Sequence, residues 1–181
     1  MIAMKKIIVL LVVCSISMTA FAQEKEADNI PNKSFIAELG GPGVLFSANF
    51  DTRFKKSPLG LGARIGIGFV SGDESVYDPV NQYYDYRMRS VLTVPFQLNY
   101  LFGKPNSVNA FEVGIGATYI GKKINILDYY DDDATNVLGT ASFMYRRMPK
   151  DGGFSWRIGF TPLISSGYIQ PFGAVSVGYN F

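Results

Sequence analysis

Eight segments of this chain alternate apolar and polar residues with a period of two, which is the periodicity of a β-strand. They run over approximately residues 33–41, 43–54, 59–71, 88–102, 108–120, 135–147, 153–164 and 169–181. Each is near the roughly 9–11 residues that a tilted strand needs to cross a membrane. Beyond residue 22 no stretch approaches the roughly 18 consecutive apolar residues of a membrane-spanning helix, so any crossing must use strands.

The two faces of these segments differ in polarity. One face is apolar, and by its spacing it includes Val44 in the second segment and Pro162 in the seventh. The other face is small and polar, and it holds every charged residue that lies well inside a segment. These residues are Glu38, Asp51, Arg53, Arg64, Glu112, Arg146 and Arg157.

The glycines indicate which face points inward. A soluble barrel of the lipocalin kind turns its apolar face inward, whereas a membrane barrel turns that face toward lipid. Gly62, Gly66 and Gly114 lie on the polar face. A narrow interior needs small residues wherever long side chains cross it, while glycine only weakens a strand that faces solvent. We therefore predict an all-β fold, an eight-stranded antiparallel up-and-down transmembrane β-barrel with a polar interior.

Aromatic residues gather at one end of the predicted strands. An even number of strands places both chain ends on the periplasmic side, so alternate strands run up and down. The periplasmic ends then carry Phe35, Phe54, Tyr100, Phe102, Phe111, Tyr145, Phe154, Trp156, Tyr179 and Phe181. Such a girdle is favoured at a membrane interface.

The connections 55–58, 103–107 and 148–152 at this end are short, whereas 72–87 and 121–134 at the other end are long and polar; "GGPG" and "SSGYI" make short outer loops.

The first 22 residues, "MIAMKKIIVLLVVCSISMTAFA", have the lysines, the apolar run and the small-x-small ending of a secretory signal peptide. We expect cleavage between Ala22 and Gln23, a flexible lead-in at 23–32 and one barrel domain at 33–181. Without Lys5 and Lys6 the 17 basic residues become 15, which balances the 15 acidic residues. A neutral chain gives no electrostatic support for nucleic-acid binding.

Residues 33–181 resemble the small eight-stranded outer-membrane β-barrel proteins of Gram-negative bacteria, of the OmpA membrane domain and OmpX type. The resemblance rests on "ELGGPGVLFSANFDTRF", on "TVPFQLNYLFG", and on a last strand with Tyr179 third from the end and a terminal Phe181. It implies an outer-membrane location, outer-membrane lipid as the surroundings, and recognition of the last strand by the outer-membrane assembly machinery. We expect a monomer.

Two prolines depart from the pattern of such barrels. Pro95 lies in the middle of a predicted strand, although a closed barrel has no edge strand to accommodate it. We expect a bulge or a missing ladder bond there. Pro162 raises the same difficulty nearer a strand end.

The seven inward charges allow more than one function. Unpaired buried charges cost several kcal/mol, so we expect an internal network of ion pairs that plugs the barrel. The predicted role is then structural, or one of surface interaction with an unidentified ligand through loops 72–87 and 121–134. A narrow channel for small solutes is the first alternative, and a periplasmic lipocalin-like carrier is the second.

Catalysis and metal binding have little support in the sequence. Enzymes on similar barrels rely on histidine-assisted serine chemistry, and the chain has no histidine. We expect no catalytic activity and no cofactor. Consecutive carboxylates in "DYYDDDAT" (128–135) cannot all point at one ion, so we expect a solvated acidic loop without a metal. The tyrosines of "VYDPVNQYYDYRMR" (76–89) suit either an adhesive surface or strands that extend beyond the bilayer.

Overall fold

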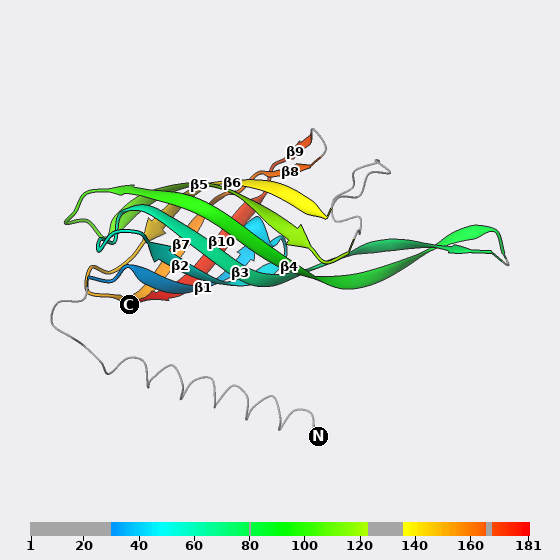
Figure 1. Cartoon of the computed structure of the whole chain (residues 1–181), viewed down its shortest axis with the longest axis horizontal. Coiled ribbons are helices and arrows are strands. Elements are labelled where there is room, and N and C mark those ends of the chain that lie inside the picture. Colours follow the sequence, from blue (N-terminus) through cyan, green and yellow to red (C-terminus); the bar gives the residue numbers. More distant parts are fainter. Residues whose placement is uncertain (1–29, 80, 123–135, 166–167) are drawn as a thin grey trace, which may run out of the picture.

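The computed structural model describes residues 30–79, 81–122, 136–165 and 168–181, which form an almost entirely β-structure (Figure 1). Its elements are β1 (Lys33–Gly40), the 3₁₀ helix η1 (Gly41–Gly43), β2 (Phe46–Arg53), β3 (Gly60–Asp78), β4 (Tyr83–Gly103), β5 (Asn109–Ile120), β6 (Val137–Arg147), β7 (Gly153–Phe160), β8 (Leu163–Ser165), β9 (Tyr168–Gln170) and β10 (Gly173–Asn180). The sheet closes because β1 pairs with both β2 and β10, and β5 with both β4 and β6. In this described part of the chain no helix is long and apolar enough to cross a bilayer.

The ten labelled strands occupy the eight strand positions of the barrel wall, which we call staves. Two of these staves are interrupted next to prolines, so each of them carries two strand labels. β7 and β8 keep one register against β6, and the break between them falls at Thr161–Pro162. β9 and β10 form the last stave with a break at Pro171–Phe172. The Thr161 N–H donates to the Phe172 carbonyl at 2.6 Å and joins the two staves at their breaks. The predicted closed eight-stranded antiparallel barrel is therefore confirmed.

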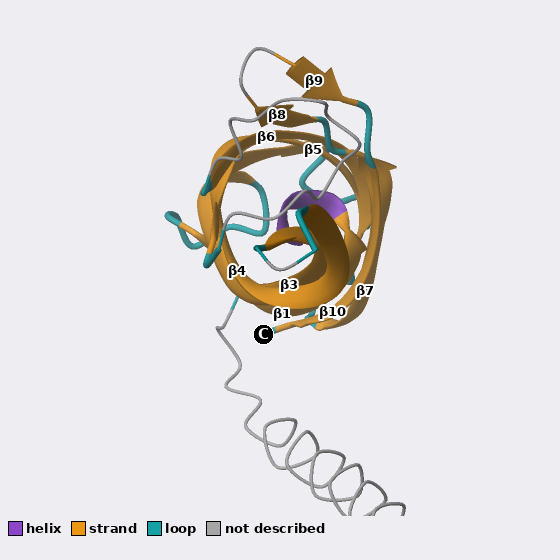
Figure 2. Ribbon diagram, turned by 90° about the vertical axis from the view of Figure 1, so that its right-hand side faces the viewer, coloured by secondary structure: helices purple, strands orange, loops and turns teal. Residues whose placement is uncertain are grey.

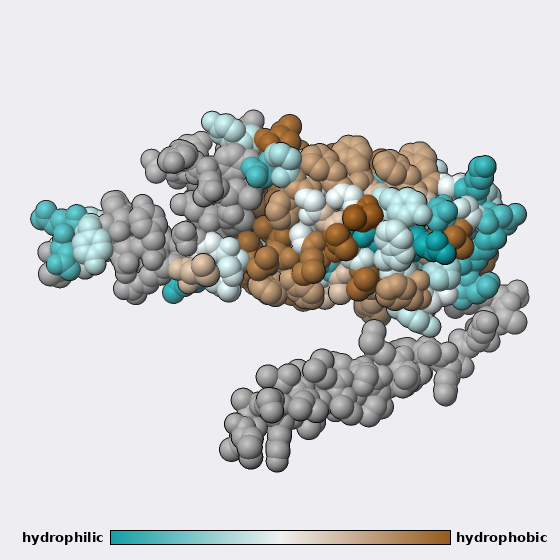
Figure 3. Space-filling model, turned by 180° about the vertical axis from the view of Figure 1, so that it is seen from behind, coloured by the Kyte–Doolittle hydropathy of each residue, from teal (hydrophilic) through white to brown (hydrophobic). Residues whose placement is uncertain are grey.

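The wall of the barrel is apolar outside and polar inside. Phe35 and Ile115 are 60% and 71% exposed on the outside, whereas Glu112 and Arg157 are 0% and 1% exposed in the lumen. Figure 3 shows apolar side chains over the body of the barrel and hydrophilic ones at its two ends. This arrangement confirms the predicted face assignment. It contradicts the lipocalin-like alternative, which requires an apolar lumen.

Two residues assigned to the outward face are buried instead. Val44 is 4% exposed because β2 begins only at Phe46, and the preceding residues turn into the lumen. Pro162 is buried at the break between β7 and β8, where the alternation of the strand is lost. Both errors come from extending a period of two through residues that are not paired as a strand.

The expected polar loop 72–87 is mostly paired strand. β3 and β4 continue as an antiparallel ribbon from Gly72 opposite Arg89 to Asp78 opposite Tyr83, beyond the end of the barrel (Figure 1). Of the two interpretations of this tyrosine-containing stretch, the structure supports extended strands. We call this end of the barrel the hairpin end, and the opposite end, with the connections 54–59, 104–108 and 148–152, the turn end. Connection 121–134 lies largely outside the described residues.

Pro95 is accommodated by a missing stretch of ladder. The β3–β4 pairing stops at Ile65 opposite Phe96 and resumes at Gly68 opposite Thr93 without a change of register. On its other side Pro95 remains paired with Thr118 of β5. Because proline has no N–H to donate, the gap falls on the β3 side only. Of the two expected irregularities, a bulge and a missing ladder bond, the structure shows the missing ladder bond.

Candidate functional site

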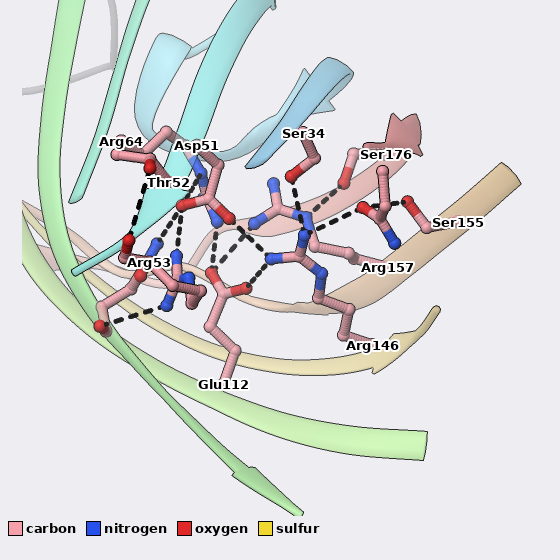
Figure 4. A network of polar contacts seen from close by, with 12 residues as sticks. Ser34, Asp51, Thr52, Arg53, Arg64, Glu112, Arg146, Ser155, Arg157 and Ser176 are labelled. Carbon is pink, nitrogen blue, oxygen red and sulfur yellow. Dashed lines mark hydrogen bonds and ion pairs between the residues drawn. The ribbon is translucent and has the colours of Figure 1, made fainter. Parts of the chain in front are cut away.

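The candidate site is the lumen, where a network of charged side chains occupies the middle of the barrel (Figure 4). Glu112 of β5 lies at its centre. Its Oε1 accepts from Arg64 Nη2 at 2.5 Å and from Arg157 Nη1 at 2.9 Å, and its Oε2 accepts from Arg146 Nη1 at 3.3 Å. One carboxylate therefore joins arginines from β3, β7 and β6, which lie far apart in the sequence.

Asp51 and Glu38 complete the network. Asp51 accepts from Arg146 Nη1 at 2.7 Å and from Arg53, and its Oδ1 lies 3.9 Å from Arg64 Nε. Glu38 Oε1 accepts from Arg157 Nη2 at 2.6 Å. The structure thus joins all seven charged residues expected on the inward face, from β1, β2, β3, β5, β6 and β7. Four guanidinium groups face three carboxylates, so the network carries one excess positive charge.

Neutral side chains hold the arginines in place. Arg64 Nη1 donates to Gln97 Oε1 at 3.1 Å, Arg146 Nη2 to Ser34 Oγ at 2.9 Å, and Arg157 Nε to Ser176 Oγ at 2.8 Å. Asn99 Nδ2 donates to Asp51 at 3.0 Å. Moving each charged group from water into the lumen costs several kcal/mol. Ion pairs offset this cost only when their geometry is good and further hydrogen bonds support them, so these bonds stabilise the network.

Glycines make room for these long side chains. A Cβ at Gly114 would lie 2.6 Å from Ser142 Oγ and 2.9 Å from the Gln97 side chain. A Cβ at Gly62 would collide with the Arg53 guanidinium. Gly62 and Gly114 therefore occur where another side chain crosses the lumen, as the sequence predicted.

The segment Gly41–Gly43 lies inside the barrel near the hairpin end (Figure 2). All three of its residues are buried. Thr118 Oγ1 donates to the Pro42 carbonyl at 2.5 Å, and Thr93 Oγ1 donates to the Gly43 carbonyl at 3.1 Å. The expectation of a short outer loop at "GGPG" is therefore wrong, because these backbone groups find partners in the lumen rather than in water.

An unusual backbone conformation accompanies η1. Gly40 and Gly41 have φ of 73° and 70°, a region that favours glycine. Val44 also has φ of 73°, which is a genuine outlier for a β-branched residue and costs about 1–3 kcal/mol. Its side chain packs in a buried apolar cluster at the hairpin end. This cluster consists of Val44, Val70, Val91, Ile120, Leu138 and Leu163, with Phe172 against it.

The sequence did not lead us to expect that η1 lies inside the lumen, or that the apolar cluster around Val44 lies next to it. A signal was present, because residues 40–44 read Gly-Gly-Pro-Gly-Val and contain no polar side chain for water to solvate.

A smaller apolar cluster of Leu101, Ala110 and Met148, with Leu59 against it, lies at the turn end. The charged network therefore lies between an apolar layer at each end of the lumen.

The aromatic residues expected in the girdle lie on the outside near the turn end. They are exposed from 36% for Trp156 to 64% for Phe154. Several contact one another across strands. The rings of Phe35 and Phe181 are stacked and those of Tyr145 and Trp156 are tilted, and the ring centroids of each pair are 5.4 Å apart. Each of these aromatic residues lies within three residues of the end of a strand at the turn end.

The acidic side chains of the lumen are paired with arginines. Within the described ranges no group of three or more His, Cys, Asp or Glu is placed to hold a metal ion. The carboxylates of Glu38, Asp51 and Glu112 are engaged by guanidinium groups. The acidic stretch Asp131–Asp133 lies outside the described residues.

An apolar outer wall around an ion-paired lumen, carried by eight antiparallel staves, defines an outer-membrane-type β-barrel fold. The fold is similar to the N-terminal β-barrel domain of Pseudomonas aeruginosa OprF, with a TM-score of 0.53 and 12% identity over 84% of this chain and 98% of that one. At this identity the likeness concerns the fold alone. No protein-family model and no curated protein matches the chain.

We predict that Glu112→Gln lowers the free energy of unfolding by about 3–5 kcal/mol, because it leaves buried arginines without their shared carboxylate. Urea unfolding of the barrel in lipid vesicles measures the change. Asp151→Asn is the control, since this carboxylate is exposed in the turn after β6 and should change stability by less than about 0.5 kcal/mol. Equal effects of the two substitutions would contradict the central position of Glu112.

A second prediction concerns the attachment of η1. Thr118→Val removes the hydroxyl that donates to the Pro42 carbonyl and should destabilise the barrel by about 1–3 kcal/mol. Thr140→Val is the matched control. Thr140 is equally buried, but its Oγ1 has no hydrogen-bond partner in the described part of the chain, so valine should be neutral or stabilising. Thermal unfolding of the two variants measures both changes in stability. If Thr140→Val lost as much stability as Thr118→Val, the stabilising role of the Thr118 hydroxyl would be refuted.

Proposed function

We propose that this chain is an integral outer-membrane β-barrel whose lumen is closed to solutes. Its role is structural or interactive, with the β3–β4 hairpin and the connection 121–134 on the cell surface and the turn end in the periplasm. In this proposal residues 1–22 are removed on export, and the last stave is recognised by the outer-membrane assembly machinery. The mature barrel is a monomer in outer-membrane lipid.

The observation that carries the proposal is the filling of the lumen. Glu112 and its three arginine partners come from four different strands and are almost fully buried. η1 and its apolar cover lie on one side of this network, and a second apolar cluster lies on the other. A solute would have to displace hydrogen-bonded charges and both apolar layers, which disfavours the channel alternative. Because the carboxylates and guanidinium groups are engaged with one another, the proposed role is not enzymatic.

The hairpin supports the proposed surface role. Its strands extend beyond the barrel, and Tyr77, Tyr83 and Met88 are exposed, the last to 82%. Exposed aromatic and methionine side chains provide adaptable contact area for a partner. The fold itself needs no such extension, because the barrel closes through strands that end near Phe69 and Leu92.

Closure is tested by conductance. We expect the barrel, inserted in a planar bilayer, to carry no sustained current, because the charged network and the two apolar clusters occupy the lumen. Heat-modifiability on a gel provides the control that the inserted protein is folded. A sustained current that Arg64→Gln or Glu112→Gln abolishes would overturn closure in favour of a channel.

The proposed orientation is tested by labelling single cysteines. The natural Cys14 falls within the expected leader, so the mature chain has no other thiol. Asn81→Cys lies in the exposed tip of the hairpin, and Asn106→Cys lies in an exposed turn at the other end. In intact cells of a Gram-negative host, a membrane-impermeant maleimide should label Asn81→Cys and spare Asn106→Cys until the outer membrane is opened. The reverse pattern would invert the orientation, and labelling of both would exclude a membrane-spanning barrel.

A further inference from the structure

The outer wall is not uniformly convex but carries an apolar groove across β10, β1, β2 and β3. The groove is open on its outer side and has a volume of about 850 Å³. Ala37 of β1 and Ala48 of β2 lie opposite each other in its floor. The larger side chains of Phe35, Phe50 and Ile67 stand around them. The hollow arises because two neighbouring strands place methyl groups where the adjoining rows carry rings or branched chains.

Lysines lie at the turn end of this groove. Lys33 continues the outward row of Phe35 and Ala37 on β1, and Lys55 and Lys56 follow the end of β2. The Arg53 N–H donates to the Asn32 carbonyl at 2.7 Å, which holds the start of the β2–β3 turn beside the start of β1. All three lysines are exposed, and none has an ion pair within the described residues.

The whole rim at the turn end is positively charged. Its exposed cations are Lys33, Lys55, Lys56, Lys104, Arg147 and Lys150, and its one acidic residue in the described part of the chain is Asp151. Figure 3 shows hydrophilic side chains gathered at this end, next to the apolar wall. A cationic rim beside an aromatic band is complementary to lipid phosphates, since aromatic rings settle where hydrocarbon meets headgroups.

We propose that the groove and the three lysines form a binding site for an anionic phospholipid of the leaflet at the turn end. One acyl chain lies over Ala37 and Ala48, and the headgroup phosphate meets the ammonium groups of Lys33, Lys55 and Lys56. The site rests on the proposed function, because it requires the barrel to span a bilayer. A second copy of this chain is the weaker candidate, since a two-fold contact on this face would bring two cationic rims together.

The test is native mass spectrometry of the mature barrel, reconstituted in vesicles with equal amounts of phosphatidylglycerol and phosphatidylcholine carrying the same acyl chains. We expect phosphatidylglycerol to remain bound in preference to phosphatidylcholine. The triple variant Lys33→Gln, Lys55→Gln, Lys56→Gln should lose this adduct at least about tenfold, because each cation near an anionic headgroup adds to the attraction. Ala48→Phe, which fills the groove and keeps the lysines, should lose it as well.

The matched control is Lys104→Gln, Arg147→Gln, Lys150→Gln. It removes the same charge from the β4–β5 and β6–β7 side of the rim and should retain the adduct within about twofold. Equal losses in the two triple variants, or full retention in Ala48→Phe, would overturn a defined site. A protein dimer in place of the lipid adduct would overturn it in favour of a second copy.

Heat-modifiability of the reconstituted protein separates this inference from the proposed function. A barrel that shows the folded gel shift in vesicles but no preference for phosphatidylglycerol would overturn the lipid site alone. A chain that does not insert would overturn the proposed membrane location, and the lipid site with it.

Discussion

The contact between Glu112 and its arginines is the constraint on which the rest of the barrel depends. The apolar outer wall leaves the charged side chains in the middle of the strands no place but the lumen, where an unpaired charge costs several kcal/mol. Arg64, Arg146 and Arg157 reach one carboxylate only when β3, β6 and β7 stand in their observed register with β5. A slip of one residue would turn the charges of a strand toward the outside. Register and charge pairing therefore specify each other.

The rest of the lumen follows from this central network. Long arginine side chains leave no space for a Cβ at positions such as Gly62. Toward the hairpin end, where no arginine reaches, the interior is filled by η1 and an apolar cluster instead. The positive φ of Val44 is maintained because its side chain completes that cluster, while Thr93 and Thr118 bind the backbone beneath it. Ion pairs fill the middle of the lumen, and apolar side chains fill its two ends.

The alternating pattern predicted the barrel and its face assignment because inward charges on one strand, such as Asp51 and Arg53, lie two residues apart. The pattern failed beyond the closed wall of the barrel. Residues 72–78 pair with 83–89 outside the wall, where neither face has to be apolar, so a strand there resembles a polar loop. The composition of residues 40–44 hints at burial, but the partner of the Pro42 carbonyl could not be predicted, since Thr118 lies 76 residues further along the chain. The sequence also identified which charges would meet in the lumen, but the partners of each one follow only from the register of the closed sheet.

The two ends of the barrel differ in charge. Within the described residues the exposed rim at the turn end holds six cations and Asp151, whereas the ribbon 72–89 at the other end contains Asp73, Glu74, Asp78 and Asp85 against Arg87 and Arg89. Within the lumen the charges nearly cancel, so this asymmetry belongs to the two ends. A bilayer whose leaflets differ in headgroup charge would distinguish these ends and favour one orientation, with the cations against anionic phospholipid. The same lysines that border the groove would then help to fix both the depth and the direction of the barrel in the membrane.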